Sequence, residues 1–190
     1  FVPRIISFFL VCLYSIPAFE NPASAVSYKD YERALGQAQK VTIPGLPQGD
    51  GKELDAYLYK PDGDGPYPAL VALHGAGGIF PYQVWWANEI SKYGYAVIFV
   101  DHYCTRGHLC EIGSGDDDPS RGTIMRNWQS VSPRQRVMDA VAAYRWLSRK
   151  PYTRKDKIGL IGCSWGGTSA LFAQKMARRL SLPNGGFKAT

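Results

Sequence analysis

The sequence has few of the residues that several classes of protein depend on. It contains three histidines and four cysteines in 190 residues, and its basic residues are scattered, with Arg178-Arg179 as the longest cluster. It also has no aromatic-basic nucleic-acid motif, internal repeat or low-complexity linker. The net charge of +6 is therefore explained more simply by a solvated basic surface than by a nucleic-acid partner.

Histidine and acidic residues are absent from the whole C-terminal stretch 165–190. What the chain does have is an ordinary globular composition, with 45% hydrophobic and 20% charged residues. A chain of this length can form one domain with a substantial hydrophobic core.

The N-terminal stretch FVPRIISFFLVCLYSIPAFENPASA has the order of a secretory signal. Arg4 precedes a short apolar run, and Ala23-Ser24-Ala25 supplies small residues for cleavage. The run is shorter than the roughly 20 residues of a membrane span, although an uncleaved anchor helix is the alternative. We expect residues 1–25 to be a signal peptide and residues 26–190 an exported domain, periplasmic or secreted, without a stable membrane span.

Export affects how the cysteines are interpreted. Cys104 and Cys110 could form a disulfide across the short loop CTRGHLC in an oxidising compartment. The nearby His102 and His108 suggest a metal site instead, but their spacing fits no zinc pattern. Free thiols are the third alternative.

The order of apolar and polar residues predicts an α/β protein. Two alternating stretches suit antiparallel strands, and three short apolar runs suit buried parallel strands that alternate with helices. The expected helices are 28–40 (helical or loosely ordered), 82–94, 132–150 and one after residue 164. The expected strands are 40–45, 53–61, 69–75, 95–101 and 157–162, with a turn at 62–68 and an irregular segment at about 103–132.

The helix that begins after Ser132 has the clearest signals. Ser132 can cap it and Pro133 suits its first position. Its apolar residues recur on one face: Val137, Val141, Tyr144 and Leu147.

The segment GCSWGG between the last predicted strand and the last helix matches G-x-S-x-G. Gly162 and Gly166 leave room for a sharp turn that lifts the Ser164 hydroxyl clear of the sheet. At the start of the following helix, the backbone N–H of Trp165 and the helix dipole can stabilise an oxyanion. The pattern predicts Ser164 as a nucleophile.

A second glycine-rich turn, in LVALHGAGG, follows an earlier central strand. In hydrolases of this architecture such a loop supplies the other oxyanion-hole N–H, here from Ala76, with Gly75 and Gly77 as neighbouring candidates. We expect His74 to have a structural role, through a hydrogen bond that orders the loop.

From about residue 52 to 173 the chain resembles the dienelactone hydrolase family of α/β-hydrolases, particularly its exported bacterial members. The resemblance is carried by PALVALHGAGGI, WWANEISKYGYAVIFVD, TRGHLCE, RQRVMDAVAAYRWLSRKPY and DKIGLIGCSWGG, in that order. Many members have a cysteine nucleophile where this chain has Ser164. The resemblance therefore implies a serine-type relative in which Cys163 points into the packing beneath the turn.

The resemblance implies hydrolysis of a small ester or lactone through an acyl-enzyme. Ser164 would attack the carbonyl, a histidine would take its proton, an acid would orient that histidine, and Ala76 and Trp165 would hold the oxyanion. It implies an α/β-hydrolase fold with helices on both faces of the sheet, and neither a metal nor an organic cofactor. The oligomeric state stays open.

The catalytic acid and histidine are not identified by the sequence. In this fold they follow the nucleophile, yet residues 165–190 contain neither. We therefore expect a chain truncated at its C-terminus, with the later strands missing. A rearranged triad is the alternative, in which His102 or His108 works with Asp101 or an aspartate of 116–118.

The simpler expectation for those residues is structural. His102 and His108 would line the entrance to the pocket, and the three aspartates 116–118 would form a solvated turn, because too few oxygen ligands are apparent for calcium. Asp139 would pair with Arg136 or another nearby cation.

Three functions are thus compatible with the sequence. The first is an exported ester or lactone hydrolase represented by an incomplete chain, and the second is a catalytically incomplete relative. The third is a ligand-binding module that uses Trp85, Trp86 and Trp128 as an aromatic platform.

Overall fold

A five-stranded sheet lies at the centre of the computed structural model, which describes residues 28–108 and 121–190. Its strands are arranged in the order β1-β2-β4-β3-β5. The central strands β3, β4 and β5 run parallel, whereas β1 and β2 extend the β4 edge as antiparallel strands. The strands are β1 (Gln39–Ile43), β2 (Leu54–Tyr59), β3 (Tyr67–Leu73), β4 (Ala96–Val100) and β5 (Thr153–Gly162).

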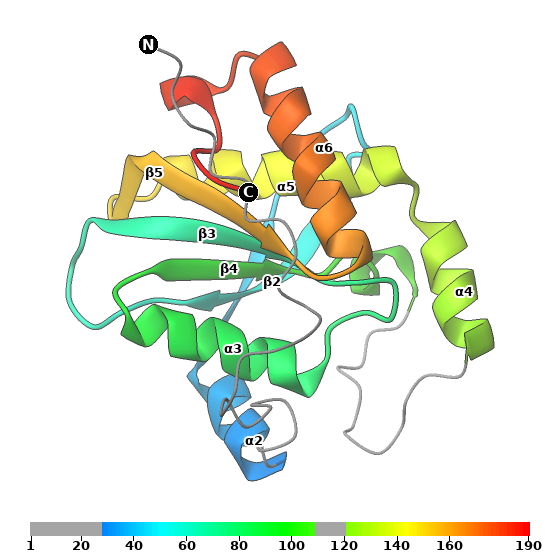
Figure 1. Ribbon diagram of the computed structural model, residues 1–190, viewed down its shortest axis with the longest axis horizontal. Helices are drawn as coiled ribbons and strands as arrows, with labels where there is room; N and C mark the ends of the chain where they lie inside the picture. The colour runs from blue at the N-terminus through cyan, green and yellow to red at the C-terminus, as the bar shows by residue number, and fades with distance from the viewer. Residues whose placement is uncertain (1–27, 109–120) are drawn as a thin grey trace, which may run out of the picture.

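Helices cover both faces of this sheet (Figure 1). On one face lie α2 (Tyr28–Gln37) and α3 (Pro81–Lys92), and on the other α5 (Pro133–Ser148) and α6 (Trp165–Arg179). A further helix, α4 (Arg121–Ser130), precedes α5, and two short 3₁₀ turns are η1 (Cys104–Arg106) and η2 (Pro183–Gly185). The predicted α/β-hydrolase architecture, with a largely parallel central sheet between two helical layers, is confirmed.

Helix α5 has the start that its sequence predicts. The Ser132 hydroxyl accepts a hydrogen bond from the Gln135 backbone N–H (3.3 Å), and the Gln135 side chain accepts one from the Ser132 N–H (2.8 Å). This reciprocal capping satisfies two backbone donors that the first helical turn leaves free. The apolar face predicted for the helix is buried: Val137, Val141, Tyr144 and Leu147.

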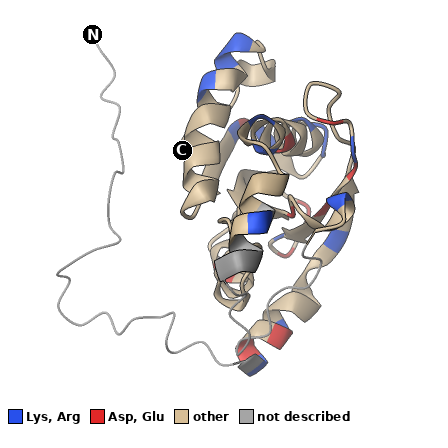
Figure 2. Cartoon of the chain, turned by 90° about the vertical axis from the view of Figure 1, so that its right-hand side faces the viewer, with Lys and Arg blue, Asp and Glu red and all other residues tan. Residues whose placement is uncertain are grey.

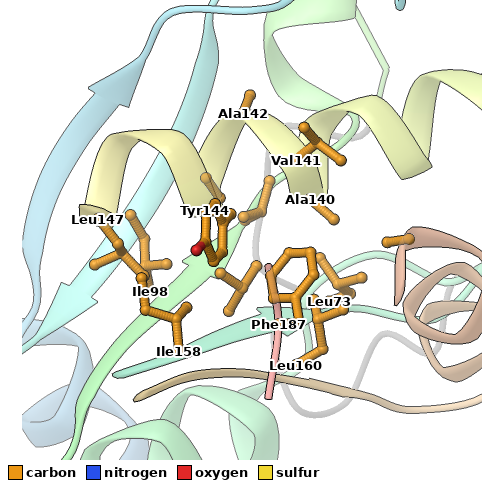
Figure 3. Packing of buried hydrophobic residues seen from close by; sticks show 14 of the residues in the cluster. Leu73, Ile98, Ala140, Val141, Ala142, Tyr144, Leu147, Ile158, Leu160 and Phe187 are labelled. Carbon is orange, nitrogen blue, oxygen red and sulfur yellow. The ribbon is translucent and has the colours of Figure 1, made fainter. Parts of the chain in front are cut away.

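The larger core cluster lies between the sheet and the α5–α6 layer (Figure 3). Phe187 closes this core near the end of the chain, with its ring centroid 4.9 Å from that of Tyr144. The next two residues run beside β5: the Lys188 N–H donates to the Ile158 carbonyl (2.8 Å) and the Leu160 N–H donates to the Ala189 carbonyl (2.9 Å). Residues 188 and 189 therefore pair with part of the outer edge of β5.

The structure differs from expectation between residues 103 and 132, where α4 replaces part of the predicted irregular segment. Its sequence, RGTIMRNWQS, has too few apolar positions to reveal a helical face. The contact that accounts for it is tertiary: the Trp128 ring packs edge-to-face on Trp165, with centroids 5.7 Å apart.

Several predictions fall outside the described residues. These are the signal peptide at 1–25, the Cys110 half of a disulfide, and the aspartates 116–118. Among the helices within 28–108 and 121–190, none combines the length and apolar character needed to cross a membrane.

Candidate active site

Ser164 lies at the sharp turn from β5 into α6. Its backbone has φ 52° and ψ −120°, a conformation with positive φ that a non-glycine residue adopts at an energetic cost. The side chain is exposed, and its hydroxyl does not cap the helix that it precedes. A serine held in this way presents its hydroxyl to a ligand instead of to its own backbone.

The flanking glycines make this turn sterically feasible. A Cβ on Gly166 would lie 2.1 Å from the Leu73 carbonyl oxygen, and one on Gly162 would lie 2.4 Å from the Gly166 carbonyl carbon. Real Cβ atoms do not approach other atoms so closely. The sequence therefore needs glycine at both positions for α6 to start against the end of β3.

The loop after β3 lies directly beside Ser164. A Cβ on Gly75 would be 3.5 Å from the Ser164 Cβ and 4.0 Å from its Oγ. Ala76 lines the same pocket as Ser164 and Trp165, so the fold brings the three predicted site residues together. Ala76 lies in the loop and Trp165 at the start of α6, the two places from which this architecture supplies backbone N–H groups to an oxyanion hole.

A pocket of about 510 Å³ opens over these residues. Its outer wall comes from α4, where Met125 and Trp128 are 41% and 40% exposed. No local pattern in the sequence indicated that α4 would lie at the site. The pocket is lined by Ala76, Met125, Trp128, Ser164, Trp165 and Thr168, all uncharged.

A second pocket, of about 420 Å³, reaches Ser164 from the α3 side of the sheet. Tyr82 and Trp86 of α3 line it, and so does Cys163. The expectation that Cys163 points into the packing is wrong: its side chain is exposed. Cys163 directly follows the last residue of β5 and is exposed at the second pocket.

The tryptophans expected as an aromatic platform do not share one surface. Trp128 lines the first pocket and Trp86 the second, whereas Trp85 is half-buried against the α2–α3 core cluster. This separation removes the main support for a ligand-binding module built on the three rings.

His102 is fully buried and does not line a pocket entrance, which corrects the prediction. Its Nδ1 lies 2.7 Å from the Asp139 carboxylate, so the ring points into the protein. Burial and the positive charges of Arg136 and Arg106 hold the pKa of His102 well below its usual value. The side chain is neutral and cannot reach a substrate carbonyl bound at Ser164.

The structure also decides which cation partners Asp139. Arg106, not Arg136, donates two hydrogen bonds to its carboxylate, both of 2.9 Å. The same guanidinium donates two more to Asp50, of 2.7 and 2.9 Å. Burial raises the pKa of Asp139 to about 6, while Arg106 acts in the opposite direction.

His74 has the structural role expected of it. Its ring is buried, and its Nδ1 lies 2.7 Å from the Gly75 carbonyl oxygen in the loop beside Ser164. In the described part of the chain, no hydrogen bond joins the Ser164 hydroxyl to a histidine. The rearranged triad built on His102 is therefore not formed.

The described residues contain no group of three or more His, Cys, Asp or Glu side chains arranged to hold a metal ion. Two side chains that sequence reasoning missed, Tyr103 and Arg136, contact the loop beside Ser164. Neither lies in a recognisable motif, and both reach the loop through contacts between residues 27 or more positions apart.

Comparison with curated proteins shows distant relatives. The "Probable 2-oxo-3-(5-oxofuran-2-ylidene)propanoate lactonase" of Bradyrhizobium sp. is 27% identical over 129 residues, 66% of this chain and 48% of that protein. Thiohydrolase aneE of Aspergillus aculeatus is 29% identical over 152 residues, 80% of this chain and 41% of that protein. The chain thus spans about half the length of these relatives or less.

Solved structures share the fold at low sequence identity. Esterase Est22 matches with a TM-score of 0.56 and 17% identity, covering 82% of this chain and 45% of the esterase. Brefeldin A esterase matches with a TM-score of 0.52 and 20% identity, covering 78% of this chain and 37% of the esterase. The model of the dienelactone hydrolase family matches residues 54–181, which include both glycine-rich turns. The chain belongs to the dienelactone hydrolase family.

Proposed function

We propose that this chain carries the nucleophile and oxyanion hole of an ester or lactone hydrolase that acts through an acyl-serine. The Ser164 Oγ would bond to the substrate carbonyl carbon and give up its proton to a base. The carbon–oxygen bond to the leaving group then breaks and the alcohol takes that proton. Water, activated by the same base, would release the acid and restore the hydroxyl.

The conformation of Ser164 is the observation that carries the proposal. Its positive φ is energetically unfavourable, and its exposed hydroxyl makes no cap to α6; a purely structural turn needs neither feature. The loop containing Gly75 and Ala76 lies within contact distance of that hydroxyl, on the side where a carbonyl oxygen would be held. A backbone N–H from Ala76 and one from Trp165 would stabilise the negative charge that develops there.

A small uncharged acyl group suits the pocket above Ser164. The aromatic wall formed by Trp128 and Trp165 is neutral, as are the other described lining residues. The names of the two curated relatives, a lactonase and a thiohydrolase, support acyl transfer to water but differ in the bond cleaved. Export of the protein, expected from residues 1–25, stays a prediction.

A catalytically incomplete form is the second candidate, because a specific observation favours it. His74 and His102 are both buried and engaged elsewhere, so neither can take the proton from Ser164. Hydrolysis by this chain would have to use a base from outside the residues described here or from His108.

Substituting the nucleophile separates the two candidates. If Ser164 is acylated, Ser164→Ala lowers kcat for a small p-nitrophenyl ester by at least about 1,000-fold. The neighbouring Cys163→Ala serves as the matched control and keeps kcat within about threefold. Turnover that survives Ser164→Ala contradicts the proposal, and an unaltered chain that hydrolyses no ester supports the incomplete form.

A further inference from the structure

The loop beside Ser164 has three successive backbone carbonyls, and a buried side chain donates to each of them. The His74 carbonyl accepts from the Arg136 guanidinium. The Gly75 carbonyl accepts from the His74 ring Nδ1 at 2.7 Å, and the Ala76 carbonyl accepts from the Tyr103 hydroxyl at 3.0 Å. All three donors come from the protein interior, so the loop is held from its inner side.

Holding a carbonyl also orients an N–H. In a trans peptide the C=O and the N–H of the same unit point in opposite directions. The Gly75 carbonyl shares its peptide with the Ala76 N–H, and the Ala76 carbonyl shares its peptide with the Gly77 N–H. Fixing these two carbonyls therefore fixes the direction of both N–H groups that could serve the oxyanion hole from this loop.

Only one tautomer of His74 can make its observed contacts. The His102 backbone N–H donates to the His74 Nε2 at 3.1 Å, so that nitrogen carries no proton. The proton of the neutral ring is then on Nδ1, where it is donated to the Gly75 carbonyl. Burial, with the nearby Arg136 charge, lowers the pKa of His74 well below its usual value and keeps the ring neutral.

Arg136 connects this loop to the other half of the site. Its Nε donates to the Ser169 hydroxyl at 3.2 Å, and that hydroxyl donates to the Trp165 carbonyl at 2.9 Å. Its guanidinium also lies over the Tyr103 ring, 5.7 Å from the centroid. The side chain is fully buried, and no ion pair joins it to a carboxylate in the described residues.

A buried guanidinium without a carboxylate is costly for the fold, because its charge loses the stabilisation of water. Burial lowers the pKa of Arg136 to about 10, yet the side chain is still charged at neutral pH. Its partners are the loop, Tyr103 and the first turn of α6. A residue needed only to fill the core would not require a charge at this place.

We propose that His74, Tyr103 and Arg136 are positioning residues that hold the two halves of the oxyanion hole, the Ala76 peptide and the first turn of α6, in a fixed relative orientation. This inference rests on the proposed function for its effect on catalysis. We call the three hydrogen bonds from these side chains to the loop carbonyls the clamp. The clamp fixes backbone orientation, which can be measured without any ester turnover.

Two substitutions at His74 form a matched pair. Asparagine places an amide donor near the position of Nδ1, whereas glutamine places its amide near that of Nε2. We expect His74→Asn to keep kcat within about threefold, and His74→Gln to lower it about 10- to 100-fold with KM changed less than about threefold. Equal losses in both variants, or an effect confined to KM, overturn the positioning role.

Tyr103→Phe removes a single hydroxyl and keeps the ring that packs on His74, at a centroid distance of 4.7 Å. It provides a test if the histidine variants do not fold. We expect a fall in kcat of about 3- to 10-fold with KM nearly unchanged, and a modest fall in melting temperature because the buried Ala76 carbonyl and Arg136 lose a partner. An unchanged kcat shows that the Ala76 carbonyl needs no clamp and contradicts the proposal.

NMR tests the clamp in the unaltered chain. In ¹⁵N-resolved imidazole spectra, His74 should show a protonated Nδ1 and a bare Nε2, unchanged between pH 5 and 8. The Ala76 amide signal should move in His74→Gln but not in His74→Asn. An Nε2–H tautomer, or an Ala76 signal that ignores both variants, overturns the clamp. If no ester is hydrolysed at all, the proposed function fails separately, and these signals still decide the clamp.

Discussion

At the scale of single residues, burial prevents two histidines from acting as a base for Ser164. His74 and His102 are both fully buried, and each is neutral because desolvation and the Arg136 charge lower its pKa. The His74 Nε2 accepts from the His102 backbone N–H and so must be unprotonated, while the Nδ1 atoms of the two rings contact the Gly75 carbonyl and the Asp139 carboxylate. They act as hydrogen-bonding groups inside the protein and not as proton carriers at its surface.

Because both histidines are buried and neutral, we expect the fold to lose stability on acidification at pH values well above those at which ordinary carboxylates titrate. Below about pH 6.5 the unfolded chain protonates both histidines, whereas the folded chain does not, so the free energy of unfolding falls as pH falls. Each histidine accounts for about 2 kcal/mol between pH 7.5 and 5. Asp139, with its pKa raised to about 6, has the opposite sign and offsets about 1 kcal/mol.

Urea unfolding at pH 7.5, 6 and 5 measures this dependence. We expect a net loss of about 3 kcal/mol over that range, reduced to about 1 kcal/mol in His74→Asn. A free energy of unfolding that is flat between pH 7.5 and 5 shows that the histidines protonate in the folded state, and contradicts their burial.

At the scale of elements, α6 approaches the end of β3 closely enough that only glycine fits between them. A Cβ at Gly166 would meet the Leu73 carbonyl oxygen at 2.1 Å and the His74 carbonyl oxygen at 2.7 Å. Backbone atoms cannot move aside as a flexible side chain can. This contact also sets how far the start of α6 lies from the loop that contains Ala76.

Gly166→Ala should therefore push the start of α6 away from the end of β3. We expect it to lower the free energy of unfolding by about 3 kcal/mol or more, because the helix must shift away from β3. Gly36→Ala in α2 is the control: nothing lies within 4 Å of its added Cβ, and alanine favours helices. The control should raise stability by about 0.5–1 kcal/mol. Equal stability of the two variants by thermal or urea unfolding contradicts the close approach.

The elements that could be predicted are those with strong local signals. Helix α5 has a cap at Ser132 and a regular apolar face, and the turn at Ser164 has its glycines at fixed spacing. Helix α4 has neither, and its Trp128 finds its partner Trp165 only in the folded protein. A helix that is stabilised mainly by contacts with another element cannot be predicted from its own local sequence.

The same reasoning explains which site residues were found. Ser164, Ala76 and Trp165 follow from two glycine-rich turns, each at the end of a strand. The burial of His102 depends on Asp139, 37 residues away, and no local pattern encodes that pairing. The exposure of Cys163 depends on the tertiary packing around the second pocket, which its neighbours in the sequence do not specify.

At the scale of the whole molecule, Ser164 is the one described residue that lines both of the pockets at the site. One is closed by α4, and the other opens between α3 and the edge of β5. Basic residues are spread over several elements (Figure 2), among them the last turn of α6 with Arg178 and Arg179. The described residues that line the two pockets at Ser164 are uncharged, although the chain carries a net charge of +6.

If Ser164 forms an acyl-enzyme, as we propose, the adduct can be trapped and located. The chain is mixed with p-nitrophenyl acetate, quenched in acid, digested and mapped by mass spectrometry. We expect the acetyl group on Ser164 itself, and no adduct at this turn in Ser164→Ala. An acetyl group on Cys163, or ester turnover that leaves Ser164 unmodified at every time point, would contradict the account.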